Sequence, residues 1–273
     1  MDTENTHPLA ASIDNKLLRF PTPESNKSRF AAKLRYWWCW FVAGALLLVV
    51  GLPALLVLWI INKKESIYPL AFWGARVWLA ACGAKIKVTG LESLDPDTSY
   101  VFASNHRSYL DTATLFIHAG RRMGLVAKKE LLKVPVLGQG MGFANVIAID
   151  RSNPDKALES MQKARDVMER GLSFGVFVEG TRAMPGQLLP FKKGAFHLAL
   201  QTRAPIVPVA IRNTDWMMGK RTGLAFPGTI EMVMLPPLST KEKTADDIPR
   251  LLLETRAAIA DELTHESITA SLA

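Results

Sequence analysis

The chain has 273 residues, which is enough for one sizeable α/β domain and an additional element. Hydrophobic residues make up 49% of the chain and its mean hydropathy is +0.12, values that are high for a soluble enzyme and low for a protein with many membrane spans. The formal net charge of +8 indicates an anionic partner, and no RNP-type or helix-turn-helix pattern supports nucleic acid. An anionic lipid surface or a phosphorylated substrate is therefore expected.

The N-terminal residues 1–35 are polar, contain three prolines and show no sustained hydrophobic period. This composition is typical of a segment that does not pack into a core. We expect these residues to form a mobile tail.

Residues 36–62 form an uncharged apolar run. About 20 apolar residues in a helix are enough to cross the bilayer core. Trp37, Trp38 and Trp40 lie near one end of the run and Trp59 near the other, where interfacial aromatic residues are common. Basic residues flank both ends, so the charge distribution does not settle the orientation. The run starts too late and is too long for a secretory signal, and no small-residue cleavage site follows it.

A second apolar stretch, residues 67–84, is interrupted by Arg76. Because a charge at mid-depth in a bilayer is unfavourable, we expect this stretch to lie in the interface or to pack on the globular body that follows it. Gly51 and Pro53 could break the first run. Residues 36–84 therefore predict a membrane-associated helical segment, which is either a true span or a two-helix element that enters one leaflet. A buried hairpin of a soluble protein is the third alternative.

From residue 85 onward, short apolar runs alternate with helical patterns, of which the clearest covers residues 154–170. A closing amphipathic helix is expected at residues 246–263. Strands that alternate with helices form parallel sheets covered on both faces, so residues 85–273 predict one α/β domain with a largely parallel sheet flanked by helices. The predicted strands include residues 86–88, 100–103, 124–126, 146–149, 175–178, 206–211 and 230–234.

Only two cysteines occur, Cys39 and Cys82, and both lie in apolar stretches. Their number and spacing predict neither a disulfide framework nor a metal site. They favour a reducing, cytosolic compartment for the catalytic body.

The first chemical motif is residues 104–111, SNHRSYLD, directly after a predicted strand. In a continuous helix, His106 and Asp111 would lie about 140° apart around the axis and would not meet. They can meet if His106 lies on the strand-to-helix turn and Asp111 about one turn into the helix, at the end of the strand where open α/β sheets bind ligands. Asp111 could then fix the tautomer of His106, whose other nitrogen would accept a proton from a substrate hydroxyl. A purely structural histidine is the alternative.

The second motif is residues 177–182, FVEGTR, at the end of another predicted strand, and FKKGA opens a helix soon after it. Gly180 permits a tight turn, and Arg182 offers a planar fork of donors for a phosphate. Lys192 or Lys193 adds positive charge near a helix N-terminus. A solvated basic loop is the alternative.

Lys128 follows a third predicted strand and begins the sequence KKEL. A lysine at a strand end could stabilise the negative charge that develops on a carbonyl oxygen. From this residue alone, a charge on the protein surface is the alternative.

These blocks, NHRSYLD, KKEL with a following Pro and Gly, VEGTR with FKKGA, and APIVPVA, resemble the glycerolipid acyltransferases. The resemblance is greatest to the 1-acylglycerol-3-phosphate acyltransferases of phospholipid biosynthesis. It covers roughly residues 90–237 and is specific, because four blocks occur in the expected order and spacing. The sequence departs from many members at Ala183, where they carry serine.

The resemblance implies three catalytic residues, with His106 as general base, Asp111 as its partner and Lys128 beside the thioester carbonyl. The residues assigned to the acceptor's phosphate are Glu179, Gly180, Thr181 and Arg182, together with Lys193. The residues that would shape the acyl-donor site are Pro205, Ile206, Val207 and Pro208.

The implied reaction transfers an acyl group from acyl-CoA or acyl carrier protein to the sn-2 hydroxyl of 1-acyl-sn-glycerol-3-phosphate, without an acyl-enzyme and without a cofactor. The implied location is the membrane, with the catalytic domain on the cytoplasmic face, and the inner membrane in a bacterium. The alternative acceptors are another lysophospholipid, a lyso-ornithine lipid and glycerol-3-phosphate.

Two other classes of protein are alternatives, a lipase or thioesterase and a non-catalytic membrane-surface protein. The G-x-S-x-G match at Ser173 does not support a hydrolase, because a helix precedes it and a strand follows, the reverse of a nucleophile elbow. His106, Asp111 and Arg182 together argue against a non-catalytic role.

Overall fold

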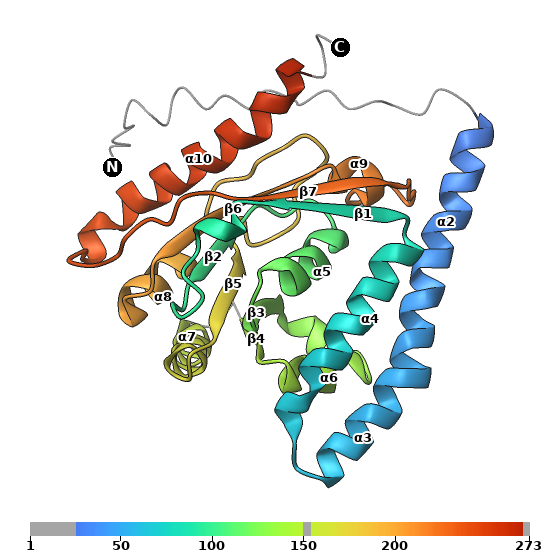
Figure 1. Cartoon of the computed structure of the whole chain (residues 1–273), viewed down its shortest axis with the longest axis horizontal. Helices are drawn as coiled ribbons and strands as arrows, with labels where there is room; N and C mark the ends of the chain where they lie inside the picture. Colours follow the sequence, from blue (N-terminus) through green and yellow to red (C-terminus); the bar gives the residue numbers. More distant parts are fainter. Residues whose placement is uncertain (1–25, 150–153, 270–273) are drawn as a thin grey trace.

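The computed structural model describes residues 26–149 and 154–269, and it contains a seven-stranded sheet with helices on both faces (Figure 1). The strand order is β1-β7-β6-β2-β5-β3-β4, and neighbouring strands are parallel except for β6 and β7. The strands are β1 (Ala84–Thr89), β2 (Val101–Ser104), β3 (Met123–Lys128), β4 (Val146–Ile149), β5 (Ser173–Phe177), β6 (Ile206–Arg212) and β7 (Gly228–Met234). The predicted largely parallel sheet is confirmed, since each predicted run overlaps one strand.

The central strands are continuously apolar because helices cover both faces of the sheet. All four residues of β2 are buried, and its side chains alternate between two cores, with Val101 and Ala103 in one and Phe102 in the other. The helices on the face of Phe102 are α4 (Ile67–Ala81), α5 (Tyr109–His118), α6 (Leu137–Phe143) and α9 (Thr214–Met218). Those on the other face are α7 (Pro154–Glu169), α8 (Gly194–Thr202) and α10 (Ile248–Thr269). Short 3-10 turns cover Lys64–Ser66, Leu91–Ser93, Lys129–Lys133 and Ala245–Asp247.

The N-terminal apolar run forms one long helix that begins earlier than expected. It consists of α2 (Asn26–Ala45), a π-helical stretch (Leu46–Gly51) and α3 (Leu52–Ile60). Gly51 and Pro53 do not end the helix, because the wide π turn lies just before Pro53, which has no N–H to donate. The helix includes residues 26–35, which the sequence assigns to the polar tail, and residues 1–25 lie outside the part of the chain that the structure describes.

The second apolar stretch forms α4, which packs on the catalytic body as expected. Ile67, Tyr68 and Leu79 are buried, and the Tyr68 hydroxyl lies 3.1 Å from the carbonyl oxygens of both Met123 and Ala144. The Trp78 indole N–H of α4 donates to the Cys39 carbonyl of α2 at 2.9 Å. This contact fixes α2 to α4 and so to the body (Figure 1).

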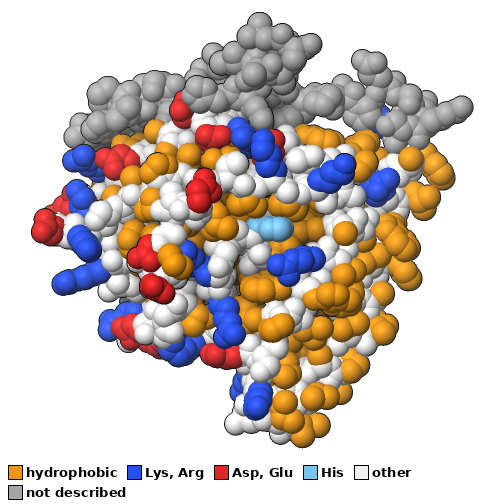
Figure 2. All heavy atoms as spheres, in the orientation of Figure 1, with side chains coloured by type: hydrophobic (Ala, Val, Ile, Leu, Met, Phe, Trp, Pro, Cys, Tyr) orange, Lys and Arg blue, Asp and Glu red, His pale blue; other side chains and the backbone are white. Residues whose placement is uncertain are grey.

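The long N-terminal helix exposes its apolar side chains. Figure 2 shows hydrophobic side chains gathered along the side of the molecule formed by α2, α3 and α4. Residues 29–60 are long and apolar enough to cross a membrane, and only 6% of their most apolar window is buried. A large exposed apolar surface on a helix of this length suggests association with a membrane. The hydrophobic side chains with the greatest exposed fraction are Phe30, Trp37, Phe41, Val49, Trp59 and Ile60.

Candidate active site

The loop between β2 and α5 starts at a point that the sheet holds firmly. Asn105, directly after β2, bridges to the neighbouring strand β6, since its side-chain oxygen accepts from Ile211 N at 2.8 Å and its amide donates to Ile211 O at 2.9 Å. Ser108 is the N-cap of α5, and its hydroxyl accepts from Leu110 N at 3.2 Å. His106 therefore lies on a short turn between two fixed points, as the sequence predicts.

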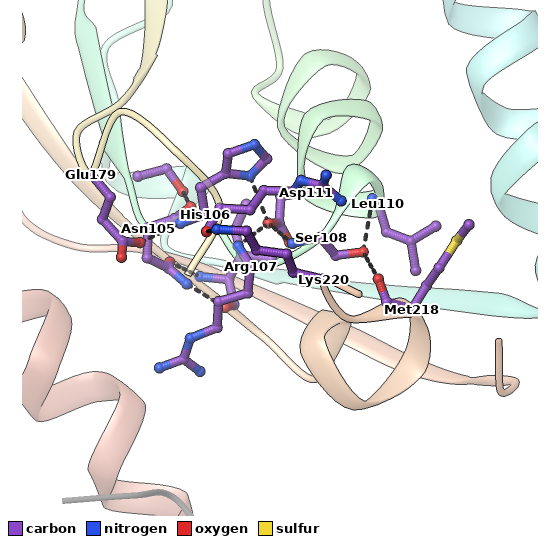
Figure 3. Close-up of polar contacts among 12 residues, drawn as sticks. Asn105, His106, Arg107, Ser108, Leu110, Asp111, Glu179, Met218 and Lys220 are labelled. Atoms are coloured by element: carbon purple, nitrogen blue, oxygen red, sulfur yellow. Dashed lines mark hydrogen bonds and ion pairs between the residues drawn. The ribbon is translucent and has the colours of Figure 1, made fainter. Parts of the chain in front are cut away.

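The His106 and Asp111 side chains meet. His106 Nδ1 lies 2.9 Å from Asp111 Oδ2, and the carboxylate is completely buried (Figure 3). The same oxygen accepts from the backbone N–H groups of Arg107 at 2.6 Å and Ser108 at 2.7 Å, so it cannot turn away. Because a carboxylate only accepts hydrogen bonds, this contact assigns the proton to Nδ1 and leaves Nε2 as the acceptor. Figure 3 shows that second nitrogen pointing away from Asp111.

Phe177, the last residue of β5, fixes the plane of the imidazole. The His106 and Phe177 rings are stacked, with centroids 4.0 Å apart and planes inclined by 18°. The His106 side chain is 15% exposed, so one edge of it is open to a ligand. The imidazole is thus held at one edge by the Asp111 carboxylate and on one face by the Phe177 ring.

Glu179 links the two motifs through its carboxylate. Its carboxylate is buried and accepts from His106 N and Leu189 N, each at 2.6 Å. Burial raises the pKa of Glu179 from 4.5 to about 7, although both backbone hydrogen bonds and the charge of Arg107 act in the opposite direction. The phosphate role that the resemblance implies for Glu179 stays a prediction, and in this structure each oxygen of its carboxylate accepts from a backbone N–H group.

The Gly180–Arg182 turn brings a guanidinium to the His106 loop. Gly180 has a φ of +74°, a conformation that favours glycine, and Thr181 is exposed. The peptide between Arg182 and Ala183 is held on both sides, since Ala183 N donates to His106 O at 2.7 Å and Lys220 Nζ donates to Arg182 O. Arg182 therefore lies within one peptide unit of the backbone of His106.

Arg107 and Asp215 form a buried ion pair that sequence reasoning missed. Arg107 Nη1 lies 3.2 Å from Asp215 Oδ2, and Arg107 Nε donates to Gln187 O at 2.9 Å. Asp215 Oδ2 also accepts from Gly186 N at 3.0 Å. The pair ties the His106 loop to α9 and to the chain after Arg182. Arg107 lies inside the first motif, but no pattern in the sequence connects it to an aspartate in a five-residue helix.

Two predicted lysines are on other elements than the loop of His106. The backbone of Lys128 ends β3, which β5 separates from β2, and the side chain of Lys128 lies outside what the structure describes. Lys193 is exposed at the start of α8, beside a hollow that it shares with His197 and Asp246. Within the described residues, the side chain of Lys193 makes no contact with His106.

The Pro205–Pro208 block begins at the amino end of β6, whereas His106 follows the carboxyl end of the neighbouring strand β2. Ile206 pairs with Val101 at the beginning of β2, whereas His106 follows the end of that strand, and Ile206 and Val207 are fully buried. A hollow of about 590 Å³ is lined by Tyr100, Ala204 and Pro205 among others. This hollow lies at the amino end of β2, whereas the imidazole follows its carboxyl end.

Ser173 is a structural residue. It begins β5, is buried, and its hydroxyl accepts from Tyr100 N at 3.1 Å. The G-x-S-x-G match is thus at the opposite end of β5 from Phe177. What lies at the site is an oriented imidazole, with the guanidinium of Arg182 over the ring of Tyr109 at the start of the following helix. Such an arrangement is suited to removing a proton from the hydroxyl of an anionic substrate.

Comparison with known proteins identifies the family. Residues 85–212 match the family model described as Acyltransferase. The chain is 39% identical over 210 residues to 1-acyl-sn-glycerol-3-phosphate acyltransferase of Limnanthes douglasii, an alignment that covers 76% of this chain and 72% of the relative. It is 35% identical over 189 residues to the alpha form from Mus musculus, covering 68% and 64% of the two chains.

The fold has a solved counterpart. The crystal structure of the 1-acyl-sn-glycerophosphate (LPA) acyltransferase PlsC from Thermotoga maritima superposes with a TM-score of 0.73 at 21% identity, covering 86% of this chain and 97% of that one. The fold and the sequence similarity agree with the resemblance that the motifs carry. The chain therefore belongs to the 1-acyl-sn-glycerol-3-phosphate acyltransferases, and it is an acyltransferase of phospholipid biosynthesis.

Proposed function

We propose that the protein transfers a fatty acyl group from an acyl thioester to the sn-2 hydroxyl of 1-acyl-sn-glycerol-3-phosphate and so forms phosphatidic acid. The observation that carries this proposal is the 2.9 Å contact between His106 Nδ1 and the buried carboxylate of Asp111. It leaves Nε2 as a proton acceptor, and the Arg182 guanidinium lies over the ring of Tyr109, three residues after His106. The thioester is that of coenzyme A or of acyl carrier protein.

In the proposed mechanism, Nε2 of His106 accepts the proton of the acceptor's hydroxyl while the oxygen attacks the thioester carbonyl. The tetrahedral intermediate collapses by breaking its carbon–sulfur bond. The departing thiolate takes the proton from the imidazolium, so His106 returns to its first state and no acyl-enzyme forms. Asp111 holds the tautomer and stabilises the imidazolium. General-base assistance of this kind is worth about 10²–10⁴-fold in rate.

The acceptor's phosphate binds at the Gly180–Arg182 turn in this proposal. Arg182 supplies paired donors that match two phosphate oxygens, and exposed Thr181 supplies a hydroxyl. Lys193 adds positive charge at a greater distance, and Lys128 is assigned to the oxyanion. The Pro205–Pro208 block acts on the acyl-donor site through the position of β2.

The bilayer supplies the acceptor, because the exposed apolar face of α2 and α3 enters the membrane where lysolipids reside. We place the catalytic domain on the cytoplasmic face, which is where the acyl thioesters are made, and at the inner membrane in a bacterium. Seating the body at the surface allows the head group to reach Arg182 while the acyl chain remains in lipid.

The experiment is an acyl-transfer assay of the purified full chain in detergent with mass-spectrometric detection of products. The acceptors are 1-acyl-sn-glycerol-3-phosphate, lysophosphatidylcholine, a lyso-ornithine lipid and glycerol-3-phosphate, each with acyl-CoA and with acyl carrier protein. Phosphatidic acid is expected as the main product. Preferred acylation of another acceptor would overturn the acceptor assignment, and free fatty acid as the main product would overturn the transfer reaction.

A further inference from the structure

The guanidinium of Arg182 lies against an aromatic ring from the other motif. Arg182 Cζ is 3.7 Å from the centroid of the Tyr109 ring, well inside the range of a cation–π contact. Within the described residues, no carboxylate forms an ion pair with Arg182. Tyr109 is therefore the group that sets the plane of this guanidinium.

This contact leaves the donors of Arg182 available. A ring that packs on the face of a guanidinium does not use its N–H groups, which lie in the plane. A carboxylate partner would occupy the same donors that a phosphate needs. Stacking on Tyr109 thus orients Arg182 without competing for the ligand.

Tyr109 is itself held between the active-site loop and the membrane-associated helix. It is the first residue of α5, directly after the N-cap Ser108, whose hydroxyl donates to Met218 O at 2.7 Å. The ring of Trp40, from α2, meets the Tyr109 ring edge to face, with centroids 5.2 Å apart and planes at 84°. Aromatic pairs favour this arrangement.

Trp40 is fixed by the contact between α2 and α4. Its ring lies 6.4 Å from that of Trp78 on α4, and Trp78 also donates to the backbone carbonyl of Cys39. A line of ring contacts therefore runs from the two N-terminal helices through Tyr109 to Arg182. The neighbouring Trp38 takes no part in it, because it is half exposed and stacks on Phe41.

We propose that Tyr109 is a positioning residue that orients Arg182 toward the acceptor's phosphate, and that Trp40 holds Tyr109 in place from α2. This inference rests on the proposed phosphate role of Arg182. Affinity for the head group then depends on how α2 is seated against the body. Since α2 is also the helix with the exposed apolar face, the same contacts connect membrane association to head-group binding.

The test measures KM and kcat for 1-acyl-sn-glycerol-3-phosphate at saturating acyl-CoA in mixed micelles. Tyr109→Leu is expected to raise KM roughly three- to tenfold with little change in kcat, from the usual strength of a partly buried cation–π contact. Tyr109→Phe keeps the aromatic ring, and its KM should equal that of the wild type. Trp40→Leu should raise KM about two- to fivefold, and Trp38→Leu, a matched change on the same helix, should leave it unchanged.

Arg182→Ala separates this inference from the proposed function. If Arg182→Ala raises KM and Tyr109→Leu has no further effect on kcat/KM in that background, Tyr109 acts through Arg182. If Arg182→Ala leaves KM unchanged, the proposed phosphate site is refuted together with the inference. If Arg182→Ala raises KM but Tyr109→Leu does not, or does so equally in both backgrounds, only the role of Tyr109 is overturned. Equal effects of Trp40→Leu and Trp38→Leu would overturn the link to α2.

Discussion

Replacing Asp111 by asparagine separates the charge of this residue from its hydrogen bonds. All three hydrogen bonds of Asp111 go to Oδ2, whereas Oδ1 is buried and has no partner within the described residues. In Asp111→Asn the amide oxygen can take the position of Oδ2 and keep all three donors. The backbone N–H groups of Arg107 and Ser108 hold that oxygen in place, because a flipped amide would present them with a donor.

The expected effect on catalysis is therefore the loss of a charge beside the imidazolium. A neighbouring opposite charge is worth roughly 1–4 kcal/mol to an ionised group, which corresponds to a kcat about 10- to 10³-fold lower. The expected loss of stability is about 1–3 kcal/mol, since the new NH₂ group is buried where Oδ1 has no partner. Asp111→Ala should lose activity and also more stability, because it leaves two backbone donors at the start of α5 without an acceptor.

The assay combines kcat at saturating substrates with thermal unfolding of the purified variants in detergent. Thr114→Val is a suitable control, because it changes another buried polar side chain of α5 that makes no hydrogen bond within the described residues. A kcat for Asp111→Asn within about threefold of wild type would refute the role of the carboxylate charge. An equal loss of stability in Asp111→Asn and Asp111→Ala would refute the hydrogen-bond reasoning.

Three further predictions follow from buried polar groups. The pKa of Glu179 is raised from 4.5 to about 7 in the folded state, so its contribution to stability is present below pH 4.5 and is lost as the pH rises through 7. The free energy of unfolding of the wild type should therefore fall by up to about 3 kcal/mol relative to that of Glu179→Gln between pH 4.5 and pH 8. A difference in stability between the two proteins that does not change with pH over this range would contradict the prediction. Arg107→Met leaves the buried Asp215 carboxylate without its charged partner and should destabilise the protein by about 3–5 kcal/mol in thermal unfolding, with a smaller loss when Asp215→Asn is added. Ser173→Ala should keep kcat within about twofold of wild type, and loss of turnover in a folded Ser173→Ala protein would reopen the hydrolase alternative.

The sequence was informative wherever local pattern and chain direction determine position. Alternating apolar runs and helical stretches predicted the parallel sheet, because each strand must be buried on both faces. The spacing of His106 and Asp111 predicted a turn followed by a helix, and the structure has Ser108 as the N-cap between them. Both inferences rest on the immediate chain neighbours of the residues concerned.

Contacts between distant segments were not predictable in the same way. Arg107 and Asp215 are separated by 108 residues, and the Glu179 carboxylate accepts from Leu189 N and from His106 N, which is 73 residues away. The Pro205–Pro208 block lies at the amino end of β6, and its first strand residue pairs with the start of β2.

The polar residues 26–35 belong to α2, and their composition and one contact with the body account for this. Residues 26–35 are polar, but they are rich in alanine, leucine, lysine and arginine, which are good helix formers. Ala32 is buried, and its carbonyl accepts from Ala225 N at 3.0 Å, so a contact with the body supports a helix that polarity alone argued against.

The central claim is that His106 removes the proton from the acceptor's hydroxyl. The most direct measurement is kcat of purified His106→Ala with 1-acyl-sn-glycerol-3-phosphate and acyl-CoA, alongside thermal unfolding of the same preparation. A kcat at least about 100-fold lower, in a protein that melts as wild type does, is the predicted result. Turnover within a few-fold of wild type in that folded variant would contradict the mechanism.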